Sequence, residues 1–281
     1  MKIKVFRRFR VIKTLVRKAI KILLFLCSFT LLVFICHKAY NHFSIEKSSD
    51  IGMRIDKYAR RFLGTPYDKI KIGAYVANKT IIYDREVDCM YLVFRVIELA
   101  VANGDEQKAI NFALDNRFHT KGKLDADGKV MNYGERYQYS EDVIADGKFG
   151  KSIFTNNEMQ EIQGERMHTK WFQLPIEDVI NNEKIFNKKN NQNGKEERIL
   201  DRIKTGDIIF FIRKKEIRVV NEIVAHLGIV ERMKNGDVYV IHASGKKDPN
   251  NIDDGVVRVK LGEYLKNKLD KFSGIYITRI A

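Results

Sequence analysis

The last third of the chain carries short apolar runs separated by turn signals. Residues 205–213 read TGDIIFFIR, and residues 225–245 read AHLGIVERMKNGDVYVIHASG, two β-branched runs on either side of a KNGD turn. The runs GVVRVK (255–260) and FSGIYITRI (272–280) follow, with the short helical stretch LGEYLKNKL between them. Runs rich in β-branched residues and bounded by turn residues are typical of hairpin strands. We therefore expect a mostly antiparallel sheet here.

Two earlier stretches have apolar residues at helical spacing. Residues 50–66, DIGMRIDKYARRFLGTP, predict an amphipathic helix that Gly64 and Pro66 stop. Residues 88–104, DCMYLVFRVIELAVANG, predict a helix with Asp88 as its cap and Cys89 in its first turn. Helices that precede the strands, instead of alternating with them, indicate the α+β class.

The first 44 residues have a different character. Residues 1–37 contain nine Lys or Arg and no acid, and residues 22–36, ILLFLCSFTLLVFIC, carry no charge. This run is short of the roughly 20 residues that span a bilayer, but snorkelling of Lys21 and Lys38 extends it. No small-x-small cleavage site follows, so an uncleaved signal anchor is favoured over a cleaved signal peptide. The basic flank would stay inside, which places residues 45–281 outside the cytoplasmic membrane of a bacterial envelope, or exported after cleavage.

The formal net charge of +15 suggests a nucleic-acid partner at first sight. Without the nine cations near the amino terminus, the remaining residues have a formal net charge of +6. Acidic residues are interspersed among their basic residues, and no basic stripe alternates with aromatic residues. This distribution argues against nucleic-acid binding. A mildly basic surface suits anionic polymers such as the bacterial cell wall.

Cysteine usage points to a nucleophile. Cys27 and Cys36 fall in the apolar run, which leaves Cys89 as the only cysteine of the expected exported domain. An intrachain disulfide within that domain is therefore impossible, and a single thiol in an oxidising compartment is either buried and inert or used chemically. The first turn of a helix favours the thiolate, through its backbone N–H groups and the positive end of the helix dipole.

Two of the six histidines, His226 and His242, lie in the adjacent strands of the expected hairpin. Most histidines in sheets are structural, so the strand pattern alone leaves open whether these two are structural or take part in chemistry. Cys89 and these histidines lack the HExxH and CxxC spacings of metal sites. We therefore expect neither a metal nor a cofactor.

Five motifs occur in order along the chain: GTPY (64–67), DC (88–89), TGDIIFF (205–211), AHLGIV (225–230) and IHASG (241–245). Together they resemble the NlpC/P60 cysteine hydrolases. The stretch RYQYSEDVIADG (136–147) and the HASG, GVVRV and GIYITRI ending look most like the N-acetylmuramoyl-L-alanine amidase-like branch. The resemblance runs from about residue 51 to the end. It implies a papain-like core, in which the helix bearing the nucleophile packs on an antiparallel sheet, with a long insert at about residues 105–204.

The resemblance also implies a Cys-His-His thiolate mechanism. Cys89 would be the nucleophile, His226 the general base, and His242 the polar residue that orients the His226 ring. Tyr67 matches a family position near the cysteine and could contact the developing charge.

The expected insert offers three candidate substrate-binding residues, Tyr133, Arg136 and Tyr139. Arg136 is the side chain that we expect to pair with a substrate carboxylate, because a guanidinium binds carboxylates with two parallel hydrogen bonds. The two flanking tyrosines suit a sugar-peptide ligand.

The implied function is hydrolysis of amide bonds in peptidoglycan fragments, as an N-acetylmuramoyl-L-alanine amidase. The alternatives are a γ-D-glutamyl endopeptidase of the NlpC/P60 type and a non-catalytic wall-binding module. After the cysteine, this chain has Met90, Tyr91 and Phe94 where the branch has small hydroxyl and acidic side chains. We expect this departure to alter specificity.

Overall fold

The computed structural model describes residues 50–163, 170–182, 184–185, 197–218, 222–245 and 254–281. Residues Ser49–Ala281 form one compact unit. The expected membrane anchor, residues 1–44, lies outside the described residues. Within the part of the chain that is described, no helix is long and apolar enough to cross a bilayer.

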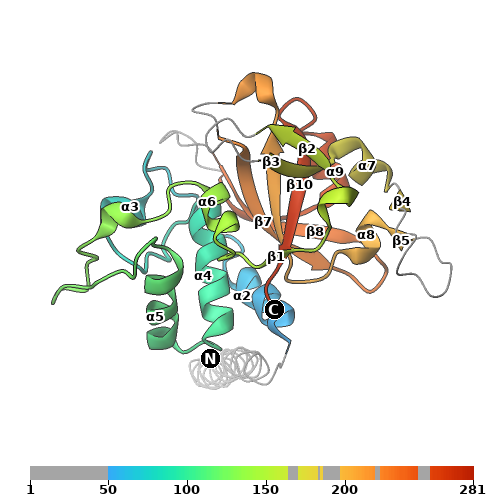
Figure 1. Cartoon of the computed structure of the whole chain (residues 1–281). Helices are drawn as coiled ribbons and strands as arrows, with labels where there is room; N and C mark the ends of the chain where they lie inside the picture. Colours follow the sequence, from blue (N-terminus) through green and yellow to red (C-terminus); the bar gives the residue numbers. More distant parts are fainter. Residues whose placement is uncertain (1–49, 164–169, 183, 186–196, 219–221, 246–253) are drawn as a thin grey trace, which may run out of the picture. The chain divides into compact units, whose positions relative to one another are not determined.

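An eight-stranded antiparallel sheet forms the centre of the unit (Figure 1). Its strands run in the order β2, β3, β10, β6, β7, β8, β9, and β1 pairs with β10 off this path. The strands are β1 (Lys151–Ser152), β2 (Gln160–Gln163), β3 (Lys170–Pro175), β6 (Ile208–Arg213), β7 (Val224–Arg232), β8 (Val238–Ser244), β9 (Gly255–Lys260) and β10 (Phe272–Arg279). A separate two-stranded ribbon joins β4 (Lys184–Ile185) to β5 (Glu197–Arg198).

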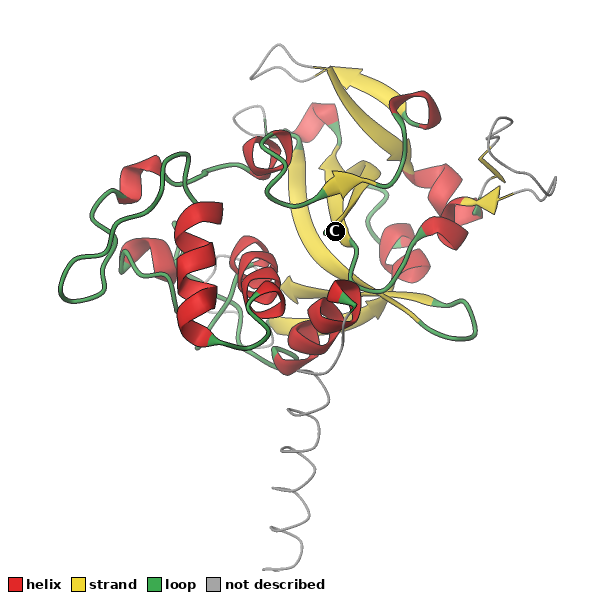
Figure 2. Cartoon of the chain, turned by 60° about the horizontal axis from the view of Figure 1, so that its bottom comes forward, coloured by secondary structure: helices red, strands yellow, loops and turns green. Residues whose placement is uncertain are grey.

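Helices flank the sheet on two sides (Figures 1 and 2). One group is α2 (Ile51–Arg61), α3 (Ala74–Ala77), α4 (Cys89–Val101), α5 (Glu106–Asn116) and α6 (Ser140–Ala145). The other is α7 (Ile176–Asn181), α8 (Ile199–Arg202) and α9 (Leu261–Lys266). Three short 3₁₀ turns are η1 (Tyr133–Glu135), η2 (Asn156–Glu158) and η3 (Lys215–Ile217). Because α4 packs against β7 and β8, the expected α+β arrangement of the cysteine helix on an antiparallel sheet is confirmed.

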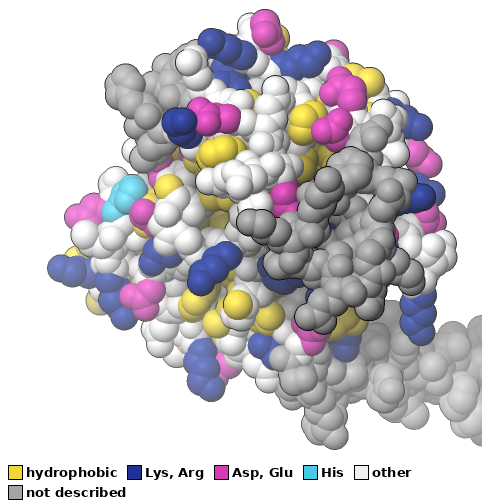
Figure 3. All heavy atoms as spheres, turned by 45° about the vertical axis from the view of Figure 1, so that its right-hand side comes forward, with side chains coloured by type: hydrophobic (Ala, Val, Ile, Leu, Met, Phe, Trp, Pro, Cys, Tyr) yellow, Lys and Arg dark blue, Asp and Glu magenta, His cyan; other side chains and the backbone are white. Residues whose placement is uncertain are grey.

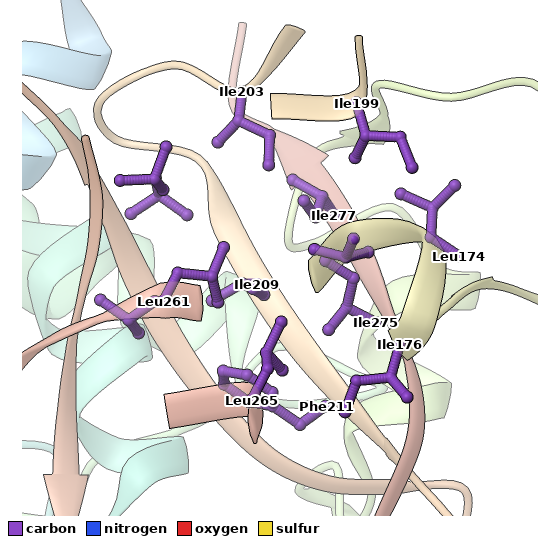
Figure 4. Close-up of a cluster of buried hydrophobic side chains, with 14 of the residues drawn as sticks. Leu174, Ile176, Ile199, Ile203, Ile209, Phe211, Leu261, Leu265, Ile275 and Ile277 are labelled. Carbon is purple, nitrogen blue, oxygen red and sulfur yellow. The ribbon is translucent and has the colours of Figure 1, made fainter. Parts of the chain in front are cut away.

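An apolar core lies between the sheet and α7, α8 and α9 (Figure 4). Ile209 and Phe211 of β6 point into it. Phe210, between them, points to the opposite face and contacts Phe149 there. Successive side chains of a strand alternate between faces, so a strand covered on both sides needs apolar residues throughout. This explains why the first five residues of β6 read IIFFI, without a polar position before Arg213.

Residues 105–204, the expected insert, are built into this unit. They supply α5, which packs on α4, and α6. They also supply β1 and β3, both of which pair with β10. The insert therefore extends the sheet at one end.

Acidic and basic side chains are interspersed on the face of the molecule that Figure 3 shows. No band of a single sign crosses this face. A mixed surface of this kind fits the charge distribution of the sequence.

A buried ion pair locks α5 against α4. Both nitrogens of the Arg117 fork donate to the Glu98 carboxylate at 2.6 Å, and a third nitrogen donates to the Ile81 carbonyl at 2.9 Å. Glu98 is 0% exposed and Arg117 is 4% exposed. The guanidinium also lies over the Tyr91 ring, 4.9 Å from its centroid. This pair joins the segment before α4, the last turn of α4 and the end of α5.

Glu98→Gln should destabilise the protein by about 3–5 kcal/mol, because it leaves the Arg117 charge buried without its counter-ion. The matched control is Glu161→Gln, which removes one side of an exposed pair with Lys170 and should cost no more than about 1 kcal/mol. Denaturant unfolding measures both free energies. Equal, small effects of the two substitutions would show that the buried pair does not hold the helices together.

Candidate active site

Cys89 begins α4, and Asp88 caps the helix. The Asp88 carboxylate accepts a hydrogen bond from the Tyr91 N–H at 2.8 Å. Cys89 is partly exposed and is in no disulfide. The first-turn N–H groups and the positive end of the helix dipole lie beside its sulfur, and both favour the thiolate.

His226 and His242 form a hydrogen-bonded pair on neighbouring strands. The Nε2 atom of His226 lies 2.9 Å from the Nδ1 atom of His242, and the two rings are nearly perpendicular. The β7–β8 register continues from Ile229 opposite Ile241. His242 therefore falls opposite Gly228, diagonal to His226 on the same face of the sheet.

The hydrogen bond defines the roles that the two rings can take. His226 has its Nε2 engaged, so Nδ1 is the nitrogen left to exchange a proton with a neighbouring group. For Nδ1 to accept a proton, it must be unprotonated in the neutral ring, so Nε2 carries the hydrogen and donates it to the Nδ1 of His242. His242 then carries its own proton on Nε2, an atom that is buried and has no hydrogen-bond partner among the described residues.

Both imidazoles are held neutral at pH 7. Burial is the main cause of the low pKa of His226, and His242 and Lys268 lower it further. Burial likewise lowers the pKa of His242 to about 4, against a weaker opposing effect of the Ala243 backbone. A neutral imidazole is the form that can act as a general base. Since both values lie below those of an unfolded chain, this pair stabilises the fold fully above about pH 6.5 and progressively less as pH falls toward 4.

Two tyrosines lie near Cys89, and one of them, Tyr264, also contacts the histidine pair. The centroid of the Tyr264 ring on α9 lies 4.8 Å from the centroid of the His242 ring and 6.4 Å from that of the His226 ring. Burial raises the pKa of Tyr264, and the charge of the Cys89 thiolate raises it further. The pKa of Tyr67 is raised by the same two causes in the same order. Both tyrosines therefore lie within electrostatic reach of the cysteine, and α4, which begins with it, packs on the two strands that carry the histidines.

Glycine is required at two places in this region. A Cβ atom on Gly228 would lie 2.4 Å from the Val240 side chain and 3.3 Å from the His242 Cβ. A Cβ on Gly245 would lie 2.2 Å from the Tyr67 ring. The glycine of the HASG motif thus lets Tyr67 lie flat against the end of β8, three residues beyond His242.

The expected substrate-binding residues lie near the start of α4. Tyr133 is mostly buried and donates to the Tyr75 carbonyl, while the Arg136 guanidinium lies 5.7 Å from the Tyr133 ring centroid. The charge of Asp88 raises the pKa of Tyr133, although burial is the larger cause. Tyr139 is half-buried at the start of α6, next to Ser140, whose hydroxyl lies 3.5 Å from the Met90 sulfur.

Two of the three unusual residues after the cysteine belong to the core. The Tyr91 hydroxyl donates to Asp84 at 2.7 Å and accepts from the Tyr83 N–H at 2.5 Å. Phe94 packs on Phe149, with ring centroids 4.8 Å apart. Met90 is the one of the three that is only partly buried.

Glu141 and Tyr264 were not predicted as site residues from the sequence. Glu141 is buried on α6, and its carboxylate accepts from the backbone N–H groups of Ile223 and Val224. The β6–β7 register shifts just after the pairing of Phe211 with His226, so β7 has one extra residue there. Such a bulge redirects the neighbouring side chain. Glu141 therefore anchors the irregular backbone that aims His226.

Among the described residues, no group of three or more His, Cys, Asp or Glu side chains could hold a metal ion.

Solved structures of similar fold come from Bacteroides. An N-acetylmuramoyl-L-alanine amidase from Bacteroides uniformis, at 1.15 Å resolution, aligns with a TM-score of 0.56 and 20% identity, over 81% of this chain and 97% of the other. A second structure of an amidase of that name and organism, at 1.30 Å resolution, aligns with a TM-score of 0.55 and 21% identity, over 80% of this chain and 98% of the other. A Bacteroides fragilis protein provisionally assigned as a xylanase aligns with a TM-score of 0.54 and 19% identity, over 79% of this chain and 99% of the other. At this identity the likeness establishes the fold alone.

No functionally curated protein matches the chain in sequence. The model of one protein family, described as AmiA-like, N-acetylmuramoyl-L-alanine amidase-like, matches residues 57–275. This range contains Cys89, both histidines and every strand of the main sheet except the last residues of β10. The chain therefore belongs to the N-acetylmuramoyl-L-alanine amidase-like family.

Proposed function

We propose that this protein is a cysteine hydrolase of the papain-like NlpC/P60 type that cleaves the amide between the lactyl group of muramic acid and L-alanine in peptidoglycan. Family membership supports the substrate class. The observation that carries the mechanism is the histidine pair, which lies on β7 and β8, the two strands against which the helix that begins with Cys89 packs.

The first half of the reaction forms a thioester. The Nδ1 atom of His226 takes the proton of the Cys89 thiol, and the sulfur attacks the lactyl carbonyl carbon. Backbone N–H groups at the start of α4 are suited to stabilise the oxyanion. The raised pKa of Tyr67 keeps its hydroxyl protonated at neutral pH, so it can donate to the same oxygen.

The second half returns the enzyme to its starting state. The C–N bond breaks, His226 gives its proton to the leaving amine, and the stem peptide departs with a free L-alanine amino group. Water then loses a proton to His226 and attacks the thioester, which releases the muramic carboxylic acid and restores the thiol. His242 accepts from the Nε2–H of His226 throughout and keeps the ring in one orientation.

Substrate contacts are proposed for Tyr133, Arg136 and Tyr139. They come from the segment that precedes and begins α6, beside the start of α4. Arg136 is partly exposed and carries a permanent positive charge, so it can bind a carboxylate of the stem peptide.

The products identify the bond that is cut. The full-length protein, incubated with purified disaccharide-peptide fragments, should release an intact stem peptide with a new L-alanine amino terminus and a peptide-free muramic sugar. Mass spectrometry detects both, and Cys89→Ala should yield neither. A sugar that retains L-alanine and D-glutamate would instead identify a γ-D-glutamyl endopeptidase. Binding of fragments without any cleavage would identify a wall-binding module.

The two histidines should differ in their effect on turnover. His226→Ala should lower kcat/KM by roughly 10²–10⁴-fold, because it removes the general base. His242→Ala should cost less, since an orienting group acts only through the base. His242→Asn is the matched control, because its amide oxygen can accept from His226 Nε2 and should restore part of the loss. Unchanged activity in His226→Ala would exclude this mechanism.

The reaction is also proposed to occur outside the cytoplasmic membrane, on the basis of the basic and apolar pattern of residues 1–44. A phosphatase reporter that works only outside the cytoplasm, fused after Ala281, should be active. Activity confined to a cytoplasmic reporter would overturn this location.

A further inference from the structure

An aromatic pocket opens beside α6, away from the histidine pair. It has a volume of about 330 Å³ and is lined by Trp171, Phe172 and Tyr276, together with Ala145, Asn156 and Lys170. The Trp171 and Tyr276 rings meet edge to face, with centroids 6.1 Å apart. This volume lies at the lower end of the range of small-molecule sites, roughly 300–1,000 Å³. None of these residues takes part in the proposed chemistry.

We propose that this pocket binds an N-acetylated hexosamine ring of the glycan. The inference rests on the proposed function, because it assigns the sugar part of the same substrate. Aromatic side chains offer a large apolar surface that matches the C–H faces of a pyranose. Asn156 and Lys170 also line the pocket, and the Asn156 amide and the Lys170 ammonium, which pairs with Glu161, can donate to hydroxyl and acetamido oxygens.

Helix α6 connects the pocket to the cysteine. At its first residue, the Ser140 hydroxyl lies 3.5 Å from the sulfur of Met90, next to Cys89. At its last residue, Ala145 lines the pocket. The six residues of α6 rise by about 8 Å, at 1.5 Å per residue. A glycan joined to the scissile amide at Cys89 can therefore follow α6 into the pocket.

The composition of the pocket favours a sugar over a purely apolar ligand. Asn156 and Lys170 are exposed, whereas Trp171 is buried to 8% exposure and forms its wall. A pocket with an aromatic wall and exposed polar residues suits a ligand that has apolar faces and polar edges, and a pyranose is such a ligand.

Trp171 gives this proposal a direct readout, because it is the only tryptophan of the chain. In the full-length Cys89→Ala protein, a peptide-free disaccharide of N-acetylglucosamine should change the tryptophan fluorescence in a saturable way. Maltose, which has no acetamido groups, should have a much weaker effect. The absence of any saturable change with the N-acetylated sugar would overturn the proposal.

A substitution that fills the pocket tests its location. Ala145→Phe should weaken binding of the disaccharide by at least about tenfold, because the added ring occupies the space of the sugar. The matched control is Ala126→Phe, an equally exposed position in the turn at residues 125–128, which should leave binding unchanged. Thermal unfolding verifies that both variants fold. Equal affinities in the two folded variants would place the sugar elsewhere and overturn the proposal.

The proposed sugar pocket and the proposed amidase activity can each be rejected without rejecting the other. Sugar binding is measured in a protein without its nucleophile, so it does not depend on cleavage. Saturable binding without amide cleavage by the wild type would support the pocket and reject the amidase. Amide cleavage by a wild type that gives no fluorescence response to the sugar would support the amidase and reject the pocket.

Discussion

The hydrogen bond between Nε2 of His226 and Nδ1 of His242 is the interaction on which the site depends. Two buried imidazoles cannot both be charged, and each lies where burial lowers its pKa. Both rings are neutral, so the hydrogen bond needs one ring as donor and the other as acceptor, and in the proposed mechanism His226 is the base that His242 supports. The fold has to hold the rings at a diagonal position on adjacent strands, and Gly228 leaves the room that this requires.

Helices from both groups then complete the site around β7 and β8. α4 packs on these strands and contributes Cys89 at its first turn. α9 packs on β8 and β9 and contributes Tyr264, which lies against the His242 ring. α6 contributes Glu141, which fixes the irregular start of β7. The site therefore depends on contacts between segments that are far apart in the sequence.

Local patterns were enough to predict the helix that begins at Cys89 and the hairpin that carries the histidines, because capping, periodicity and turn residues act over a few positions. They were not enough to predict β1 and β2, which are short and mostly polar and gain their order from pairing with β10 and β3. Glu141 and Tyr264 also escaped prediction. A glutamate and a tyrosine in amphipathic helices look the same in sequence whether or not a strand end or a histidine ring lies beside them.

The buried positions of Tyr91 and Phe94 change how the residues after the cysteine should be interpreted. Their side chains support α4 from inside the core, so they cannot contact a substrate directly and do not explain a difference in specificity. The partly buried Met90 and the segments that reach the start of α4 from outside are the remaining candidates for contact with a substrate. The segment around Tyr133 and Arg136 is one of these, since the Tyr137 N–H donates to the carbonyl of Arg117, whose side chain pairs with Glu98 near the end of α4. The buried pair therefore fixes this segment to the helix that begins with Cys89, so exposed side chains of the segment can change without disturbing the core around α4.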